Sequence, residues 1–72
     1  MKLEDATLGN RLKELRGQHK MTQADLAAAV GVTRKTINTV ENQIFVPSAL
    51  LAAKMAYVLK VQVDELFFLE GG

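Results

Sequence analysis

The stretch MTQADLAAAVGVTRKTINTVEN, residues 21–42, contains two helix signals that a single tight turn separates. Thr22 is a typical N-cap, and the acid three residues later can complete a capping box. Gly31 suits the C-terminal end of that helix, because glycine adopts a left-handed backbone without strain. Thr33 follows soon after and can cap a second helix. Two short helices joined by so tight a turn are typical of a helix-turn-helix, so the pattern predicts this motif.

Apolar residues recur at intervals of three and four on both sides of this stretch, and the chain contains one proline. This spacing favours helices over strands. We therefore predict an all-α fold of five helices, at about residues 8–18, 23–30, 34–42, 48–59 and 63–67. Thr7 and Ser48 would cap the first and the fourth of these helices. The buried positions would be Leu8, Leu12 and Leu15 in the first helix and Leu51, Ala52, Met55, Ala56 and Leu59 in the fourth.

The length of 72 residues corresponds to one small domain, residues 1–72, with a core at about 7–68 and flexible ends at 1–5 and 70–72. Cysteine is absent, which excludes disulfides, thiolate zinc sites and thiol nucleophiles and suits a cytoplasmic location. No apolar run predicts a membrane span. Residues 1–40 carry seven Lys and Arg against four Asp and Glu, and residues 41–72 carry two against four. The basic first part fits a polyanionic partner.

The predicted third helix has one polar and one inward side. Helical periodicity turns Ile37, Val40 and Glu41 inward, and the outward residues are Arg34, Lys35, Asn38, Thr39 and Asn42. Arg and Lys suit guanine, Asn suits adenine, and Thr offers a hydroxyl and a methyl group in a DNA major groove. We therefore predict base contacts from Arg34, Lys35, Asn38 and Thr39. The alternative is that this face is only solvated.

A second set of donors is placed to hold DNA phosphates. Free N–H groups at a helix start favour an anion, and Gln23 stands in the first turn of the second helix. The other candidates are Thr33, Asn42, Arg11 and Lys13. Such contacts would orient the protein without selecting a sequence. Thr33 is also a structural cap, and Asn42 is equally well explained as the C-cap of its helix.

The residues LKELRGQHKMTQADLAAAVGVTRKTINTVEN, followed by PS and KMAYVLKVQVDELF, resemble the Cro/CI-type, or XRE, helix-turn-helix transcriptional regulators, especially small stand-alone members. The resemblance covers about residues 8–67. It implies a lambda-repressor-like domain of five helices that binds double-stranded operator DNA, usually as a two-fold dimer. It also implies a partly buried ion pair between Arg16 and Glu41 that holds the third helix at a fixed angle. Gln43 and Lys60 stand where the family often has Gly or Asn, so both are expected to adopt a left-handed backbone.

Apolar residues in the fourth helix and near it exceed what one core stripe needs. We predict a homodimer interface from Ile44, Phe45, Val46, Leu50, Ala53, Tyr57, Phe68 and Leu69. The alternative is that Phe45 and Phe68 fold back onto the core of the monomer.

These observations favour a sequence-specific transcriptional regulator, most simply a repressor that occupies a palindromic operator. The alternative is an antitoxin or adaptor that grips a protein partner with the apolar patch. We do not expect an enzyme. The chain has one histidine, and the sequence offers no base paired with a nucleophile that could form a catalytic site. A lone His19 is a poor metal site, so neither a metal nor another cofactor is expected.

Overall fold

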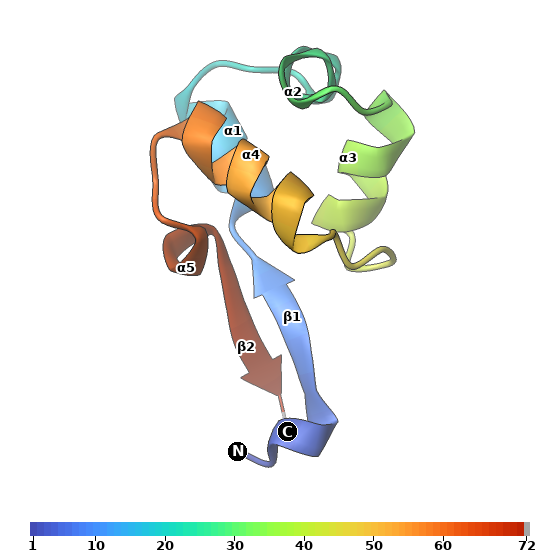
Figure 1. Ribbon diagram of the computed structural model, residues 1–72, viewed down its shortest axis with the longest axis vertical. Helices are drawn as coiled ribbons and strands as arrows, with labels where there is room; N and C mark the ends of the chain where they lie inside the picture. Colours follow the sequence, from blue (N-terminus) through green and yellow to red (C-terminus); the bar gives the residue numbers. More distant parts are fainter. Residues whose placement is uncertain (72) are drawn as a thin grey trace.

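The computed structural model describes residues 1–71, in which five helices form a body and two strands project from it (Figure 1). The elements in chain order are η1 (Leu3–Asp5), β1 (Ala6–Asn10), α1 (Leu12–Gln18), α2 (Gln23–Val30), α3 (Arg34–Glu41), α4 (Ala49–Leu59), α5 (Val63–Leu66) and β2 (Phe67–Gly71). We call the antiparallel pair β1 and β2 the arm. The five predicted helices and the helix-turn-helix formed by α2 and α3 are confirmed.

Side-chain caps fix the starts of α2, α3 and α4 as the sequence predicts. The Thr22 hydroxyl accepts the Asp25 N–H at 3.0 Å, and the Asp25 carboxylate accepts the Thr22 N–H at 2.9 Å. Thr33 and Ser48 cap α3 and α4 in the same manner. Each such cap satisfies a backbone donor that has no partner within its helix. Gly31 ends α2 with a φ of 80°, so the turn to α3 stays short.

The predicted start of the first helix at residue 8 is wrong, because residues 6–10 form strand β1 and Thr7 caps no helix. Helix α1 begins at Leu12, whose N–H donates to the Asn10 side-chain oxygen at 3.1 Å. The pairs of the arm run from Ala6 opposite Gly71 to Asn10 opposite Phe67. Leu8 packs against the core from β1. Its spacing from Leu12 and Leu15 also fits the inward side of a helix, so the apolar pattern alone did not distinguish a strand from a helix. The distant C-terminal partner strand decided the outcome.

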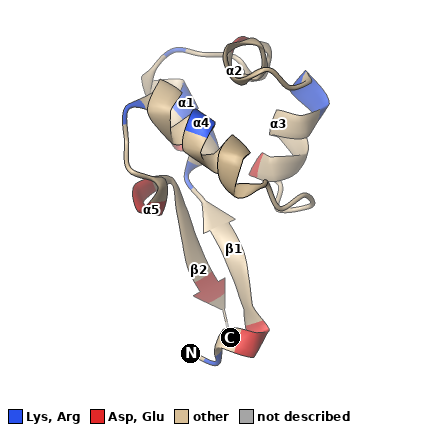
Figure 2. Ribbon diagram, viewed as in Figure 1, with Lys and Arg blue, Asp and Glu red and all other residues tan. Residues whose placement is uncertain are grey.

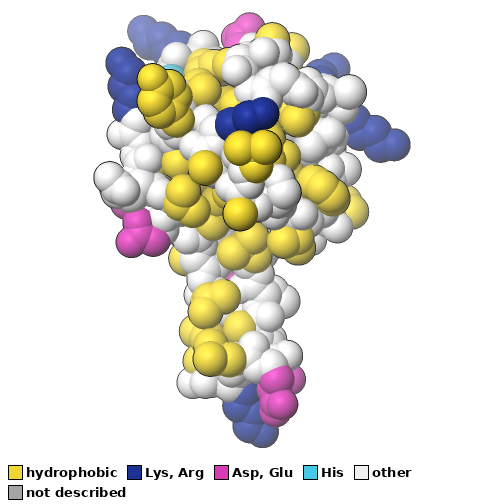
Figure 3. All heavy atoms as spheres, in the orientation of Figure 1, with side chains coloured by type: hydrophobic (Ala, Val, Ile, Leu, Met, Phe, Trp, Pro, Cys, Tyr) yellow, Lys and Arg dark blue, Asp and Glu magenta, His cyan; other side chains and the backbone are white. Residues whose placement is uncertain are grey.

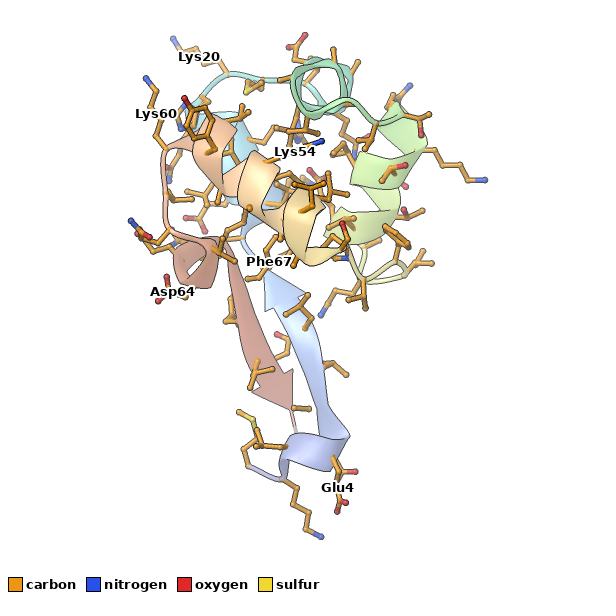
Figure 4. All side chains as sticks on the ribbon, viewed as in Figure 1. Glu4, Lys20, Lys54, Lys60, Asp64 and Phe67 are labelled. Atoms are coloured by element: carbon orange, nitrogen blue, oxygen red, sulfur yellow. The ribbon has the colours of Figure 1, made fainter. Side chains whose placement is uncertain are left out.

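The core lies between the helices and closes at the root of the arm. Its largest fully buried side chains are Leu12, Leu26, Ile37, Met55, Leu59, Leu66 and Val40. All five predicted inward residues of α4 are buried. Phe67, the first residue of β2, adds an aromatic ring where the arm joins the body (Figure 4). The arm is therefore attached to the core at one end and extends away from it at the other.

The predicted flexible ends contain regular structure over the described residues. Residues 3–5 form the short helix η1, and Glu70 and Gly71 of β2 pair with Thr7 and Ala6 of β1. Residue 72 of the predicted C-terminal end lies outside the described residues. Across residues 1–71, every helix is too short or too polar to cross a membrane.

Candidate nucleic-acid interface

One side of helix α3 is buried in the core, and the polar residues in its first turns are exposed to solvent. Ile37 and Val40 are 0% and 1% exposed. Arg34, Lys35 and Asn38 are exposed, and the basic pair lies at the α3 end nearest α2 (Figure 2). The acidic residues of η1, α5 and β2 lie elsewhere in this view. The exposed first turn of α3 therefore carries two positive charges and no acidic residue, which suits an anionic partner.

Thr39 and Asn42 are engaged within α3 itself. The Thr39 hydroxyl donates to the Thr36 carbonyl at 2.9 Å, and the Thr39 side chain is half-buried. The Asn42 amide donates to the Asn38 carbonyl at 2.9 Å, which is a helix-capping contact. The structure thus favours capping for Asn42. Both residues would have to share or exchange these bonds to contact DNA.

Gln23 lies beside the exposed residues of α3. A shallow hollow of about 340 Å³ is lined by Gln23, Arg34, Lys35 and Asn38. A neighbouring hollow joins Gln23 and Arg34 to Thr22, Ala24 and Arg16. The fold therefore brings together the residue predicted to hold a phosphate and three of those predicted to contact bases.

A partly buried ion pair ties α1 to the end of α3. Arg16 Nε donates to Glu41 Oε2 at 2.8 Å, and Arg16 Nη2 donates to Glu41 Oε1 at 3.3 Å. The two side chains are only 14% and 5% exposed. Arg16 Nη1 also donates to the Met21 carbonyl at 2.8 Å, and Gln23 Nε2 donates to Glu41 Oε1 at 3.0 Å. One carboxylate thus fixes the end of α3, the last turn of α1 and the Gln23 amide together.

Thr33, Arg11 and Lys13 contribute less directly. The Thr33 hydroxyl is held by the Thr36 N–H and the Thr36 hydroxyl, so it acts as a cap. Arg11 pairs with Glu14, which raises the pKa of Arg11 and lowers the pKa of Glu14. Lys13 and Arg11 line a hollow at the C-terminal end of α3, together with Asn10, Glu14, Gly17 and Glu41. The structure does not bring them to the exposed start of α3.

Two polar residues connect elements in ways that the sequence did not predict. Asn10 accepts the Leu12 N–H, and its amide donates to the Val40 carbonyl at 3.0 Å, so it joins β1, α1 and α3. His19 Nε2 donates to the Leu59 carbonyl at 2.8 Å and links the ends of α1 and α4. Asn10 lies two residues before α1, and asparagine at such a position is a recognisable signal for the start of a helix. No signal in the sequence indicates the contact between His19 and the Leu59 carbonyl, which lies 40 residues away.

The eight residues of the predicted interface are exposed, and hydrophobic side chains gather over α4 and along the arm on the face seen in Figure 3. Tyr57 is 86% exposed. Phe45 and Phe68 are 46% and 39% exposed, so neither belongs to the buried core, in which Phe67 takes part instead. The pairing of two chains through this surface stays a prediction.

A family model described as helix-turn-helix matches residues 12–66. The chain belongs to this family. The helix-turn-helix protein is 39% identical over 61 residues to the uncharacterized HTH-type transcriptional regulator YgzD of Bacillus subtilis, covering 85% of this chain and 92% of that one. The predicted resemblance to XRE-type regulators is thereby confirmed.

Two crystal structures have a similar fold. One is a proposed DNA-binding protein from Bacteroides fragilis, with a TM-score of 0.78 and 26% identity, covering 86% of this chain and 100% of that one. The other is the restriction-modification controller protein C.AhdI from Aeromonas hydrophila, with a TM-score of 0.72 and 31% identity, covering 76% and 83%. Within residues 1–71, no cluster of three His, Cys, Asp or Glu side chains could hold a metal ion.

Proposed function

We propose that this helix-turn-helix protein binds double-stranded DNA sequence-specifically and represses transcription by occupying a promoter. The observation that carries the proposal is the exposed group of Arg34, Lys35 and Asn38 on α3, with Gln23 of α2 beside it. A helix face that is only solvated would not need Gln23 of α2 beside its exposed residues. The names of the relatives support the same function.

Helix α3 would lie in the major groove with its first turns closest to the bases. Arg34 and Lys35 would donate to guanine O6 and N7, and the Asn38 amide would pair with adenine. The half-buried Thr39 offers its methyl group to thymine. Gln23 would donate toward a phosphate from the start of α2, where backbone N–H groups already favour an anion. Thr33, Asn42, Arg11 and Lys13 would add weaker phosphate contacts at the rim.

The apolar surface supports binding as a homodimer. Its proposed members are Ile44, Phe45, Val46, Leu50, Ala53, Tyr57, Phe68 and Leu69, and monomeric proteins rarely expose so many large apolar side chains together. A two-fold dimer would place two copies of α3 about 34 Å apart and would match a palindromic operator. Repression would then follow from blocking the promoter.

The same surface supports a second candidate function, in which it binds another protein and the chain acts as an antitoxin or adaptor. The two functions differ in what the exposed basic residues do. In the second, Arg34 and Lys35 would be dispensable, and a stable complex with a different chain would form through α4 and the arm.

The test selects bound duplexes from a random DNA pool and then measures affinity at two salt concentrations. We expect salt-sensitive, sequence-selective binding that the double variant Arg34→Ala/Lys35→Ala loses. A matched control, Lys2→Ala/Lys60→Asn, removes two charges outside α3, and asparagine tolerates the left-handed backbone at residue 60. Lys60 lies on the far side of the body from α3 (Figure 4). Equal losses in both variants, or no binding by the wild type at low salt, would refute the proposal.

A further inference from the structure

Gln43 lies directly after α3 in a backbone conformation that glutamine rarely adopts. Its φ is 59°, in the left-handed region that favours glycine or asparagine. Strain of this kind persists where surrounding contacts hold the residue in place, and it directs attention to what the side chain does. The Gln43 N–H closes the end of α3 by donating to the Val40 carbonyl at 3.1 Å. The side chain then turns away from α3 toward the arm.

The amide of Gln43 bridges to both strands of the arm. Its Nε2 donates to the Leu8 carbonyl of β1 at 3.1 Å and to Glu70 Oε1 of β2. A second tie runs in the opposite direction, from the Asn10 amide of β1 to the Val40 carbonyl of α3. The C-terminal end of α3 and the root of the arm are therefore joined by side chains from each.

The packing of the arm directs Glu70 toward Gln43. A Cβ at Gly9 would come within 2.5 Å of the Phe68 ring and 2.7 Å of the Glu70 carboxylate. Because residue 9 has no side chain, Phe68 and Glu70 can close over β1 on this face. Glu70 is half-buried as a result, and Gln43 is the side chain that donates to it.

The arm itself needs such support. A two-stranded ribbon is only marginally stable alone, and this one extends well beyond the helices (Figure 1). An apolar groove of about 620 Å³ lies between the arm and the loop after α3, with Leu8, Phe45, Val46 and Leu69 among its lining. Phe45, Val46 and Leu69 also belong to the surface proposed to meet a second copy. The direction of the arm would therefore affect how two copies meet.

We propose that Gln43 is a positioning residue that fixes the angle between the arm and α3, and thereby the half-site spacing that the dimer selects. This inference rests on the proposed function, in which two copies meet through the arm, α4 and the loop between α3 and α4. The molecule measures 22 and 20 Å along its two shorter axes. A rotation of about 10° over a lever of about 20 Å moves the partner's recognition helix by about 3.5 Å, close to the rise of one base pair.

The experiment compares Gln43→Gly and Gln43→Asn with the wild type. Glycine relieves the left-handed backbone and removes both amide bonds to the arm, whereas asparagine keeps an amide that is one methylene too short to reach it. Lys60→Gly is the matched control, because Lys60 has the same conformation, with a φ of 60°, at the end of α4. Each protein is titrated with duplexes whose half-sites are separated by the selected spacing and by one or two base pairs more or fewer.

We expect the wild type and Lys60→Gly to prefer one spacing by about tenfold or more over its neighbours. Gln43→Gly and Gln43→Asn should bind adjacent spacings within about threefold of one another, while the Tm of Gln43→Gly stays within about 5 °C of the wild type. Glu70→Gln should retain the spacing preference, because its amide oxygen can still accept from Gln43, and Glu70→Ala should lose it. A structural role alone would move the Tm and leave the spacing preference unchanged.

The two proposals fail in different ways. If the wild type binds DNA with a clear spacing preference and both Gln43 variants keep it, the inference about Gln43 is refuted and the proposed function stands. If the wild type shows no DNA binding at low salt, the proposed function is refuted, and the inference falls with it.

Discussion

Replacing Glu41 with alanine should strongly destabilise the protein, because Glu41 is the shared acceptor of Arg16 and Gln23. The variant leaves the Arg16 guanidinium, which is 14% exposed, without its counter-charge. Removing one partner of a buried ion pair costs about 3–5 kcal/mol. Arg16 keeps its bond to the Met21 carbonyl, so we expect the lower end, about 3 kcal/mol.

A chain of 72 residues has a free energy of unfolding of about 4–11 kcal/mol at the usual stability per residue. A loss of about 3 kcal/mol in a domain of this size lowers the Tm by about 12–24 °C. Urea unfolding, followed by circular dichroism, measures the change directly. Glu41→Gln is the matched comparison, because it removes the counter-charge but keeps one acceptor oxygen, so it should lose less than Glu41→Ala.

A second comparison separates the charge from the packing. Replacing both partners, as in Arg16→Met/Glu41→Leu, removes the unpaired charge and should recover most of the loss. The half-buried Gln23 can then turn its amide to solvent. The reasoning would be refuted if Glu41→Ala shifted the Tm by less than about 4 °C, or if the double variant were no more stable than the single one.

Three further predictions concern the recognition surface, the dimer and acid stability. Arg34→Ala should relax the preference for one guanine at a cost of about 1–3 kcal/mol in binding, measured with duplexes changed at each position. Leu50→Glu should dissociate the dimer in sedimentation at micromolar concentration, whereas Val63→Glu, outside the proposed interface, should not. The Thr22 N–H lowers the pKa of Asp25, so this contribution to stability is present above the ordinary value of 3.8 and is lost as the pH falls through the lowered pKa. Asp25→Asn should therefore be less stable than the wild type near neutral pH, with a difference that shrinks in acid; a constant difference would contradict this.

Local chemistry accounts for the parts of the fold that the sequence predicted correctly. The caps at Thr22, Thr33 and Ser48 act within three residues, so their effect is visible in the sequence. The left-handed backbones at Gln43 and Lys60 were also predicted correctly, but from the resemblance to a family that often has Gly or Asn at these positions. A similar conformation at Lys20 was missed, because lysine gives no signal for it.

The candidate interface also has some features that local sequence predicts and others that depend on tertiary contacts. The outward positions of Arg34, Lys35 and Asn38 follow from helical periodicity, which any residue on α3 obeys. The engagement of Gln23 with Glu41 depends on how α2 crosses α3, and the capping role of Asn42 competes with a contact to DNA. Neither could be chosen from residue types, because an amide side chain suits both roles.

The sequence by itself determined the presence of five helices, the caps of α2, α3 and α4, the helix-turn-helix and the polar face of α3, since each depends on residues within one or two turns of one another. Only the tertiary structure decided that residues 6–10 form a strand, because their partner lies some 60 residues away at 67–71 and an apolar residue such as Leu8 can be buried in either conformation. Once that pairing forms, it creates the arm, places Glu70 beside Gln43 and gives the strained residue after α3 its contacts. Pairing over such a distance depends on the closure of the whole chain, which no local pattern encodes.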